Sequence, residues 1–293
     1  MDPGLLRLFV VPVEVTILQL LLSGGIAVFR SHFLMTNSVI IRGRDFIALI
    51  DPAYYPDEVE VLGEVVARSN KPETYCLYTH FDYDHVVDPR NLQAYRVASQ
   101  AVLERDLEGE VRLWQEMDQR LYVEREDYTM PEPDYLVAGR RETIDLGEEE
   151  LVAVPLPGHT ADGLVFIFPA RRVAVVGDML SDKEFPFVND SLTAYRQSLL
   201  TLRRLVEKYQ IDLVIPGHGN VAQGSEIEQR IEADLQYLAA LSTAAQVSAG
   251  RSETEIAVLC GEIRYKNRPI PSWQQEEHRN NLLRAICEHN TEK

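Results

Sequence analysis

Histidine and aspartate side chains collect at four places in this chain, and each place directly follows a short apolar run. The longest cluster, HFDYDH at residues 80–85, follows the run 75–78, and single ligand-type residues follow three later runs. The side chains concerned are His80, Asp82, Asp84, His85, His159, Asp178 and His218. Short apolar runs are typical of buried strands, and loops at strand ends are where binding sites form. Because these loops hold four of the seven histidines, the sequence predicts a metal site where they meet.

The remaining pattern predicts two β-sheets that pack face to face. Strand-like runs rich in β-branched residues form one group before residue 80 and a second group between residues 143 and 215. The first group lies at 6–10, 13–17, 26–29, 38–41, 46–50 and 75–78, and the second at 143–146, 151–154, 164–168, 173–176 and 211–215. Helical periodicity flanks both groups, so the expected fold is of the α/β class, an αββα sandwich of two mixed sheets covered by helices.

Helices are expected on both sides of this sandwich. One begins at Pro56, where proline and acidic residues suit a first helical turn, and its apolar spacing leaves Glu58 for water. A single long helix is predicted over 101–127, and another over 193–209. Trp114 and Trp273 lie on helical apolar stripes, so we expect both in the core.

After Gly224 the pattern becomes helical throughout. Three capping boxes predict helix starts, formed by Ser225 with Glu228, Ser252 with Glu255 and Ser272 with Gln275. We therefore divide the chain into an αββα domain at 1–224 and a C-terminal helical extension at 225–293 that packs on it. The extension carries no ligand cluster, so we expect it to shape substrate choice rather than the chemistry.

Composition narrows the classes of function. The 293 residues include 29 Lys and Arg against 46 Asp and Glu, a formal net charge of −17, and such a surface repels nucleic-acid backbones. Three widely spaced cysteines, Cys76, Cys260 and Cys287, argue against a disulfide framework. The most apolar stretch, 15–29, is too short for a bilayer and is interpreted as two strands joined by a Ser-Gly-Gly turn. Because the start lacks a basic signal-peptide region, the expected location is the cytoplasm.

The order and spacing of the ligand-type residues resemble the metallo-β-lactamase superfamily. Its first motif is His-x-His-x-Asp-His, followed by single His, Asp and His ligands. Here HFDYDH is followed by steps of 74, 19 and 40 residues to His159, Asp178 and His218. The match extends to Thr36-Asn37-Ser38 and Leu49-Ile50-Asp51, and it covers about residues 30–220. The resemblance implies the αββα fold and a pair of metal ions, but it does not specify a substrate.

Carried over residue by residue, the resemblance implies two neighbouring metal sites. The first ion would be held by His80, Asp82 and His159, the second by Asp84, His85 and His218, with Asp178 bridging them. Asp82 stands where the family has its second histidine. A carboxylate there adds negative charge and hardens the site, which shifts its preference from zinc towards iron or manganese. Alternatively, Asp82 lies behind the ligands and holds His80 or a water in place.

The expected activity is that of a metal-dependent hydrolase. A hydroxide bridging two divalent metal ions, zinc first and iron or manganese as alternatives, would attack a small ester, thioester, lactone or phosphoester. Asp84 is the expected catalytic residue, which orients the hydroxide and relays the proton. Thr160 and Tyr83 are expected to be turn residues.

Two other functions stay open at this point. The carboxylate of Asp82 is similar to the Glu that flavodiiron proteins carry at this position, which predicts a di-iron oxidoreductase, although no flavin-binding pattern is present. A non-catalytic binding protein on the same fold is the third possibility. The expected partner is a small molecule rather than a nucleic acid or a membrane, and a homodimer is left open.

Overall fold

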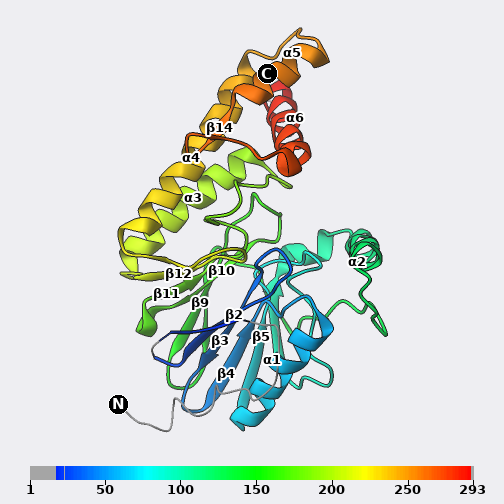
Figure 1. Cartoon of the computed structure of the whole chain (residues 1–293). Helices are drawn as coiled ribbons and strands as arrows, with labels where there is room; N and C mark the ends of the chain where they lie inside the picture. Colours follow the sequence, from blue (N-terminus) through cyan, green and yellow to red (C-terminus); the bar gives the residue numbers. More distant parts are fainter. Residues whose placement is uncertain (1–17, 23, 292–293) are drawn as a thin grey trace.

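Two mixed β-sheets face each other at the centre of the structure, a computed structural model that describes residues 18–22 and 24–291 (Figure 1). Within these residues the first sheet has seven strands in sequence order, antiparallel from β1 to β4 and parallel from β4 to β7. They are β1 (Leu18–Leu22), β2 (Ile26–Arg30), β3 (Asn37–Arg42), β4 (Phe46–Ile50), β5 (Glu73–Leu77), β6 (Tyr95–Ser99) and β7 (Tyr135–Val137). The predicted strands at 6–10 and 13–17 lie outside the described residues, and the other four of the first group are confirmed.

The second sheet has six strands in the order β13-β12-β11-β10-β9-β8, and its β11–β12 pair is parallel. They are β8 (Glu142–Asp145), β9 (Glu150–Pro155), β10 (Leu164–Phe168), β11 (Val173–Val175), β12 (Leu213–Ile215) and β13 (Ala222–Gln223), with a 3₁₀ turn η2 (Pro169–Arg171) after β10. Val28 and Ile41 of the first sheet pack with Phe166 and Val175 of the second. This shared core between two sheets explains why both predicted groups of strands are so apolar.

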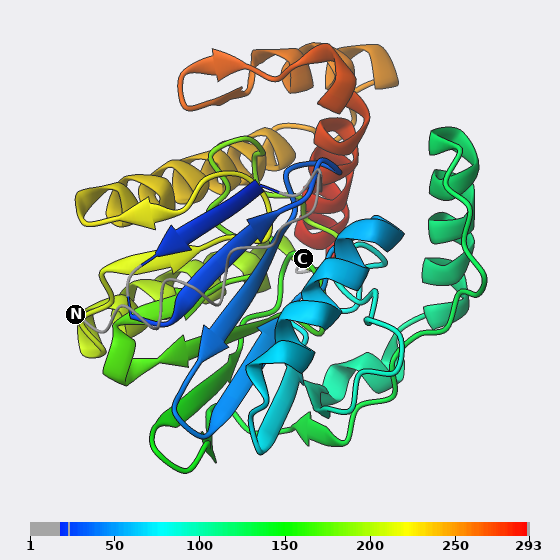
Figure 2. The same ribbon diagram turned by 60° about the horizontal axis from the view of Figure 1, so that its bottom comes forward.

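Helices cover the outer faces of both sheets and complete the predicted αββα sandwich (Figure 2). Helix α1 (Pro56–Ser69) packs on the first sheet, and α3 (Leu192–Lys208) packs on the second. The prediction that Glu58 faces water is wrong, since its side chain lies in the buried interior. Its carboxylate accepts a hydrogen bond from the backbone N–H of His32 at 3.1 Å, so it serves as the partner of a loop.

The prediction of one helix over 101–127 is wrong because the helical conformation is interrupted at Arg105. A 3₁₀ turn η1 (Gln100–Glu104) ends there, and α2 (Leu107–Leu121) begins after Asp106, whose side chain accepts from the backbone N–H of Gly109. Helix α2 stands at the periphery in Figure 2 and buries Trp114 and Asp118. The break directs Arg105 at the loop that carries the first ligand cluster.

The segment after Gly224 is helical, as predicted, with a small hairpin before its last helix. It contains α4 (Ser225–Gln246), α5 (Glu253–Glu262), β14 (Arg264–Tyr265), β15 (Arg268–Pro269), η3 (Ser272–Gln274) and α6 (Gln275–Thr291). The capping box of Ser252 and Glu255 is confirmed. Ser225 is instead the first residue of α4 without a side-chain cap, and Ser272 begins η3, so the other two predicted capping boxes are wrong.

The extension shares one hydrophobic cluster with α3 and the second sheet. Leu199 and Leu202 of α3 lie in it together with Ile231 and Leu238 of α4 and Leu282 of α6. The helices after Gly224 therefore bury their apolar faces on the sandwich.

Two remaining expectations concern Trp273 and membrane-spanning segments. Trp273 is 66% exposed rather than in the core, because η3 buries the neighbouring Gln274 instead. Among the described residues, no helix combines the length and the apolar character that crossing a bilayer requires.

Candidate metal centre

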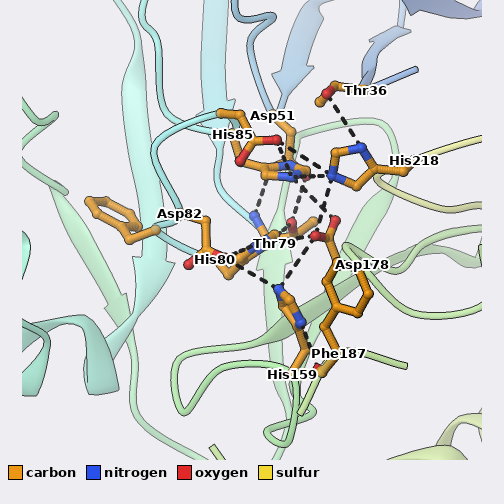
Figure 3. Close-up of polar contacts among 12 residues, drawn as sticks. Thr36, Asp51, Thr79, His80, Asp82, His85, His159, Asp178, Phe187 and His218 are labelled. Carbon is orange, nitrogen blue, oxygen red and sulfur yellow. Dashed lines mark hydrogen bonds and ion pairs between the residues drawn. The ribbon is translucent and has the colours of Figure 1, made fainter. Parts of the chain in front are cut away.

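All seven side chains predicted as ligands meet in one cluster at an edge shared by both sheets (Figure 3). The loop 80–85 follows β5 of the first sheet. His159, Asp178 and His218 follow β9, β11 and β12 of the second sheet. Loops from two sheets that face each other thus bring His85 and His218, which are 133 positions apart, into contact.

Among the described residues, three groups of three side chains have their ligand atoms within 4.8 Å of one another, and two of these groups share no residue. In the first group, Asp82 Oδ2 lies 3.5 Å from His80 Nε2 and 3.3 Å from His159 Nε2. These three residues are the set predicted for the first metal ion.

The second group lies beside the first and has the same donors, two histidines and one aspartate. His85 Nε2 and His218 Nε2 lie 3.2 Å apart. Asp84 Oδ2 is 3.8 Å from the former nitrogen and 3.5 Å from the latter. These are the three residues predicted for the second metal ion.

Asp178 lies between the two groups and approaches both histidines of each. Its Oδ1 is 3.2 Å from His85 Nε2, and its Oδ2 is 3.3 Å from His218 Nε2 and 3.4 Å from His159 Nε2. The same Oδ2 is 3.8 Å from His80 Nε2. This is the position that a bridging carboxylate must take.

Each of the four histidines uses its Nδ1 outside the cluster, which leaves Nε2 for the centre. His159 Nδ1 is 2.9 Å from the carbonyl of Phe187, and His218 Nδ1 is 3.0 Å from that of Leu34. A carbonyl oxygen only accepts, so these Nδ1 atoms carry the proton and the neutral ring presents a lone pair at Nε2. Fixing the tautomer in this way is what metal-binding histidines require.

A buried aspartate, Asp51, orients the other two histidines at their Nδ1 atoms, His85 directly and His80 through Thr79. Its Oδ2 lies 3.3 Å from His85 Nδ1 and accepts from the hydroxyl of Thr79 at 2.6 Å. That hydroxyl oxygen is 3.0 Å from His80 Nδ1 and can accept from it. Asp51 directly follows β4 with a φ of 50°, a left-handed conformation that is unusual for a residue other than glycine. The sequence resemblance included Asp51 but assigned it no role.

The chemistry of this donor set fits divalent cations. His80 Nε2 and Asp178 Oδ1 are buried and have no hydrogen-bond partner among the residues that the structure describes, and His85 Nε2 and His218 Nε2 lie 3.2 Å apart. Buried polar atoms are rarely left without a partner, and an ion placed among these atoms would coordinate them.

Without an ion, the histidines and carboxylates stabilise each other's charges. Burial alone would lower the pKa of His159, but the hydrogen bond to Asp82 and the charge of Asp178 raise it to about 9. Burial also opposes protonation of His218, whereas the charges of Asp178 and Glu184 raise its pKa to about 10. Conversely, burial would raise the pKa of Asp178, yet the charges on His218, His85 and His80 hold it well below its usual value.

The repeated Pro-Gly-His sequence has a steric reason in both loops. A Cβ on Gly217 would lie 2.2 Å from Asp178 Oδ1, and a Cβ on Gly158 would lie 2.2 Å from the Cα of Tyr195. Gly158 also has a φ of 133°, which residues with a side chain rarely adopt. Glycine is therefore needed before each histidine so that the loop can approach its neighbours.

The chain's family follows from these residues and from comparison with known proteins. The family model described as the metallo-beta-lactamase superfamily matches residues 33–218. The chain belongs to this superfamily. The matched segment begins just before β3 and ends at His218, so it spans every residue of the cluster.

A relative and several solved structures are similar to this superfamily member. Lactamase-like protein aptB of Emericella nidulans is 24% identical over 192 residues, which are 64% of this chain and 52% of aptB, so the chain spans about half the length of that relative. A metallo-beta-lactamase from Pontibacter korlensis has a TM-score of 0.54 at 20% identity and covers 75% of this chain and 99% of its own. A metallo-beta-lactamase family protein from Thermus thermophilus has a TM-score of 0.64 at 18% identity, and the match covers 92% of this chain and 94% of that protein. The sec-alkylsulfatase Pisa1 from Pseudomonas sp. has a TM-score of 0.67 at 16% identity, and the match covers 92% of this chain and 50% of Pisa1. These structures show the fold.

Three other residues near the centre differ in how well the sequence predicted them. Tyr83 lies in a turn and Thr160 in a bend, as expected, and each is next to a candidate ligand in the chain. The Thr160 hydroxyl is buried and has no hydrogen-bond partner within the described part of the chain. Arg105 was missed altogether, although it contacts Asp82 at 2.7 Å. Its signal was hidden because the sequence around it has helical periodicity.

Proposed function

We propose that this member of the superfamily is a metal-dependent hydrolase of a small ester, thioester, lactone or phosphoester. The observation that carries the proposal is the position of Asp178 between two facing groups of ligand-type side chains. A pair of cations that shares one carboxylate needs this arrangement, and paired metal sites are typical of hydrolytic enzymes.

Two cations held here would lower the pKa of a shared water towards neutrality and attract the negative charge that develops on the substrate. The protein would supply position and proton transfer. Asp84 is buried at the centre with Oδ2 3.5 Å from His218 Nε2. We assign it the orientation of the attacking water and the transfer of a proton to the leaving group.

Metal analysis followed by a substrate panel tests this proposal. Protein purified without added metal should contain about two transition-metal ions per chain, with zinc expected first. The panel should include an aryl ester, a thioester, a lactone, a phosphodiester and, because Pisa1 is a sec-alkylsulfatase, a secondary alkyl sulfate. Hydrolysis should stop on chelation and return on addition of metal. A chain that binds no metal would contradict the proposal.

A di-iron oxidoreductase is the second candidate, and one observation favours it. The carboxylate of Asp82 faces His80 and His159 in the first group, and a hard oxygen ligand favours iron or manganese over zinc. Iron in the purified protein together with oxygen consumption driven by an added reductant would support this candidate. Bound metal without turnover in either assay would instead support a binding protein.

Asp82→His tests whether Asp82 sets the metal preference. The exchange removes one negative charge and one oxygen ligand from the first group, so we expect the zinc-to-iron ratio of the purified protein to rise several-fold. Elemental analysis of both proteins, expressed side by side in one medium, measures it. If Asp82 only supports other ligands, the ratio should stay constant while affinity falls by about 10–100-fold. An unchanged ratio with unchanged affinity would exclude both roles.

Metal binding should release protons at neutral pH. The pKa values of His159 and His218, about 9 and 10, mean that both rings are protonated at pH 7 before an ion binds. An ion needs the unprotonated Nε2, so zinc affinity should rise with pH until these groups have titrated. Despite its burial, His85 also has a pKa well above its usual value because of the charges of Asp178 and Asp84. Calorimetric titration of the metal-depleted chain in two buffers of different ionisation enthalpy should therefore give a release of about three protons at pH 7. A release of none would contradict the protonated state of these histidines.

A further inference from the structure

A largely buried arginine lies directly behind Asp82. Arg105 occupies the turn between η1 and α2, and its guanidinium contacts three carboxylates. Its Nη2 donates to Asp82 Oδ1 at 2.7 Å and to Glu110 Oε1 at 2.5 Å, and its Nη1 donates to Asp162 Oδ1 at 2.8 Å. The side chain is 12% exposed, so these charge-assisted hydrogen bonds hold the planar guanidinium in one place.

Arg105 divides the two oxygens of Asp82 between different partners. Oδ1 accepts from Arg105, whereas Oδ2 faces His80 Nε2 at 3.5 Å and His159 Nε2 at 3.3 Å. The terminal torsion of an aspartate is soft, so an unsupported carboxylate could rotate or bind an ion through either oxygen. The contact with Arg105 directs one defined oxygen at the first ligand group.

Arg105 also supports the backbone of the loop 80–85, through Asp162. Asp162, which is almost fully buried, accepts from Arg105 through Oδ1 and from the backbone N–H of Phe81 at 2.9 Å through Oδ2. Phe81 directly precedes Asp82 in the chain. Arg105 thus supports both the carboxylate of Asp82 and the peptide before it.

We propose that Arg105 is a positioning residue for the first metal ion, and that the Asp82–Arg105 pair takes the place of a histidine ligand. Arg105 directs Asp82 Oδ2 towards the space between His80 and His159. The inference rests on the proposed function in one respect, because it requires the first group to bind metal.

Charge and position predict opposite effects when Arg105 is lost. A cation close to two bound cations repels them, so removal of its charge alone should strengthen metal binding. Loss of a residue that orients a ligand instead weakens metal binding, by about 10–100-fold. For Arg105→Met we expect weaker binding of this size for one of the two ions and an unchanged affinity for the other, since the three carboxylates that Arg105 contacts include no residue of the second group.

The test measures zinc affinity by competition with a chromophoric chelator on the metal-loaded full chain. Arg171→Met is the matched control, because Arg171 is also mostly buried, with a side-chain exposure of 15%, and binds Glu149 and the carbonyl of Arg42 rather than a ligand residue. It should leave both affinities unchanged. Arg105→Lys keeps a cation in the cluster and, if the methionine variant does not fold, should weaken the same ion because an ammonium cannot hold two carboxylates in a fixed fork.

The D82H background separates positioning from a general structural role. There the carboxylate that Arg105 directs is absent and only its support of the Phe81 peptide through Asp162 remains. Adding Arg105→Met should therefore weaken zinc binding much less than it does in the wild-type background. The visible spectrum of the cobalt-substituted chain should likewise shift on Arg105→Met in the wild-type background and stay nearly constant in D82H. Equal losses in both backgrounds, or unchanged or tighter zinc binding by Arg105→Met, would overturn the inference. A wild-type chain that binds no zinc would overturn the proposed function as well. Normal zinc binding by both the wild-type chain and Arg105→Met would overturn the inference alone.

Discussion

Exchange of Asp178 for alanine should remove both metal ions and abolish hydrolysis together. Its carboxylate lies within 3.4 Å of the Nε2 atoms of His85, His218 and His159, and within 3.8 Å of that of His80. A pair of unit charges about 4 Å apart interacts by about 4 kcal/mol at an effective dielectric constant of 20, which is about a thousandfold in affinity. Without this shared negative charge, two cations in adjacent groups would also repel each other with nothing between them.

Metal content and turnover of the same preparation measure this effect. Asp178→Asn keeps the volume but removes the charge, and it should lose metal almost as severely as the alanine variant. Asp212→Ala is the matched control, since Asp212 is an exposed aspartate that pairs with Arg172 next to β12. Exposed pairs contribute little, so this control should keep its metal and its activity. Two bound ions per chain in Asp178→Ala would contradict the bridging role.

The positions of the candidate ligands could be predicted because they follow strands with buried apolar residues at or near their ends. β11, for example, spans Val173–Val175 within the predicted range 173–176, and every residue in it is buried. Strands that are covered on both faces have no polar positions, so the first polar residues after them stand out. His159 and Asp178 are such residues, and the sheets bring their loops to one edge.

The residues that orient the ligands could not be predicted in the same way. Asp51 follows β4 as Asp178 follows β11, but nothing in its sequence distinguishes a ligand from the residue that holds one. Arg105 lies in a segment with helical periodicity, and the turn that aims it at Asp82 depends on the cap that Asp106 provides. Glu58 was placed in water because helical spacing alone does not show that a neighbouring loop needs an acceptor.

The contact with Arg105 also changes the argument about metal identity. From the sequence, Asp82 adds a full negative charge to the first group, which favours iron or manganese. In the structure one oxygen of that carboxylate is bonded to a guanidinium at 2.7 Å, so part of its charge is already balanced before an ion binds. The remaining preference for a hard ion then comes from the oxygen ligand itself. This reasoning keeps zinc as the first expectation.

Exchange of Arg230 for methionine should destabilise the protein and loosen the metal centre from the side of the extension. Arg230 of α4 is 3% exposed and donates to the carbonyls of Leu180 at 2.9 Å and Asn220 at 2.7 Å. These residues come two positions after Asp178 and His218, so one guanidinium is hydrogen-bonded to both of the loops that carry them. Removal of the guanidinium leaves these carbonyl oxygens without their donor, and an unsatisfied buried polar group costs about 1–3 kcal/mol. We expect a fall in melting temperature of roughly 5–10 °C and zinc binding weaker by about tenfold.

Thermal unfolding and chelator competition on the metal-loaded chain check this expectation. Arg203→Met is the matched control, because Arg203 also joins α4 to the sandwich, through Glu228 and Glu232, but is about one-third exposed. Exposed ion pairs are worth about 0–1 kcal/mol, so its melting temperature should change little and its zinc affinity should stay constant. If Arg230→Met melted and bound zinc like Arg203→Met, the extension would act on substrate choice alone, as its lack of ligands first indicated. If it lost zinc affinity as expected, the helices after Gly224 would have a direct part in holding the loops that carry Asp178 and His218.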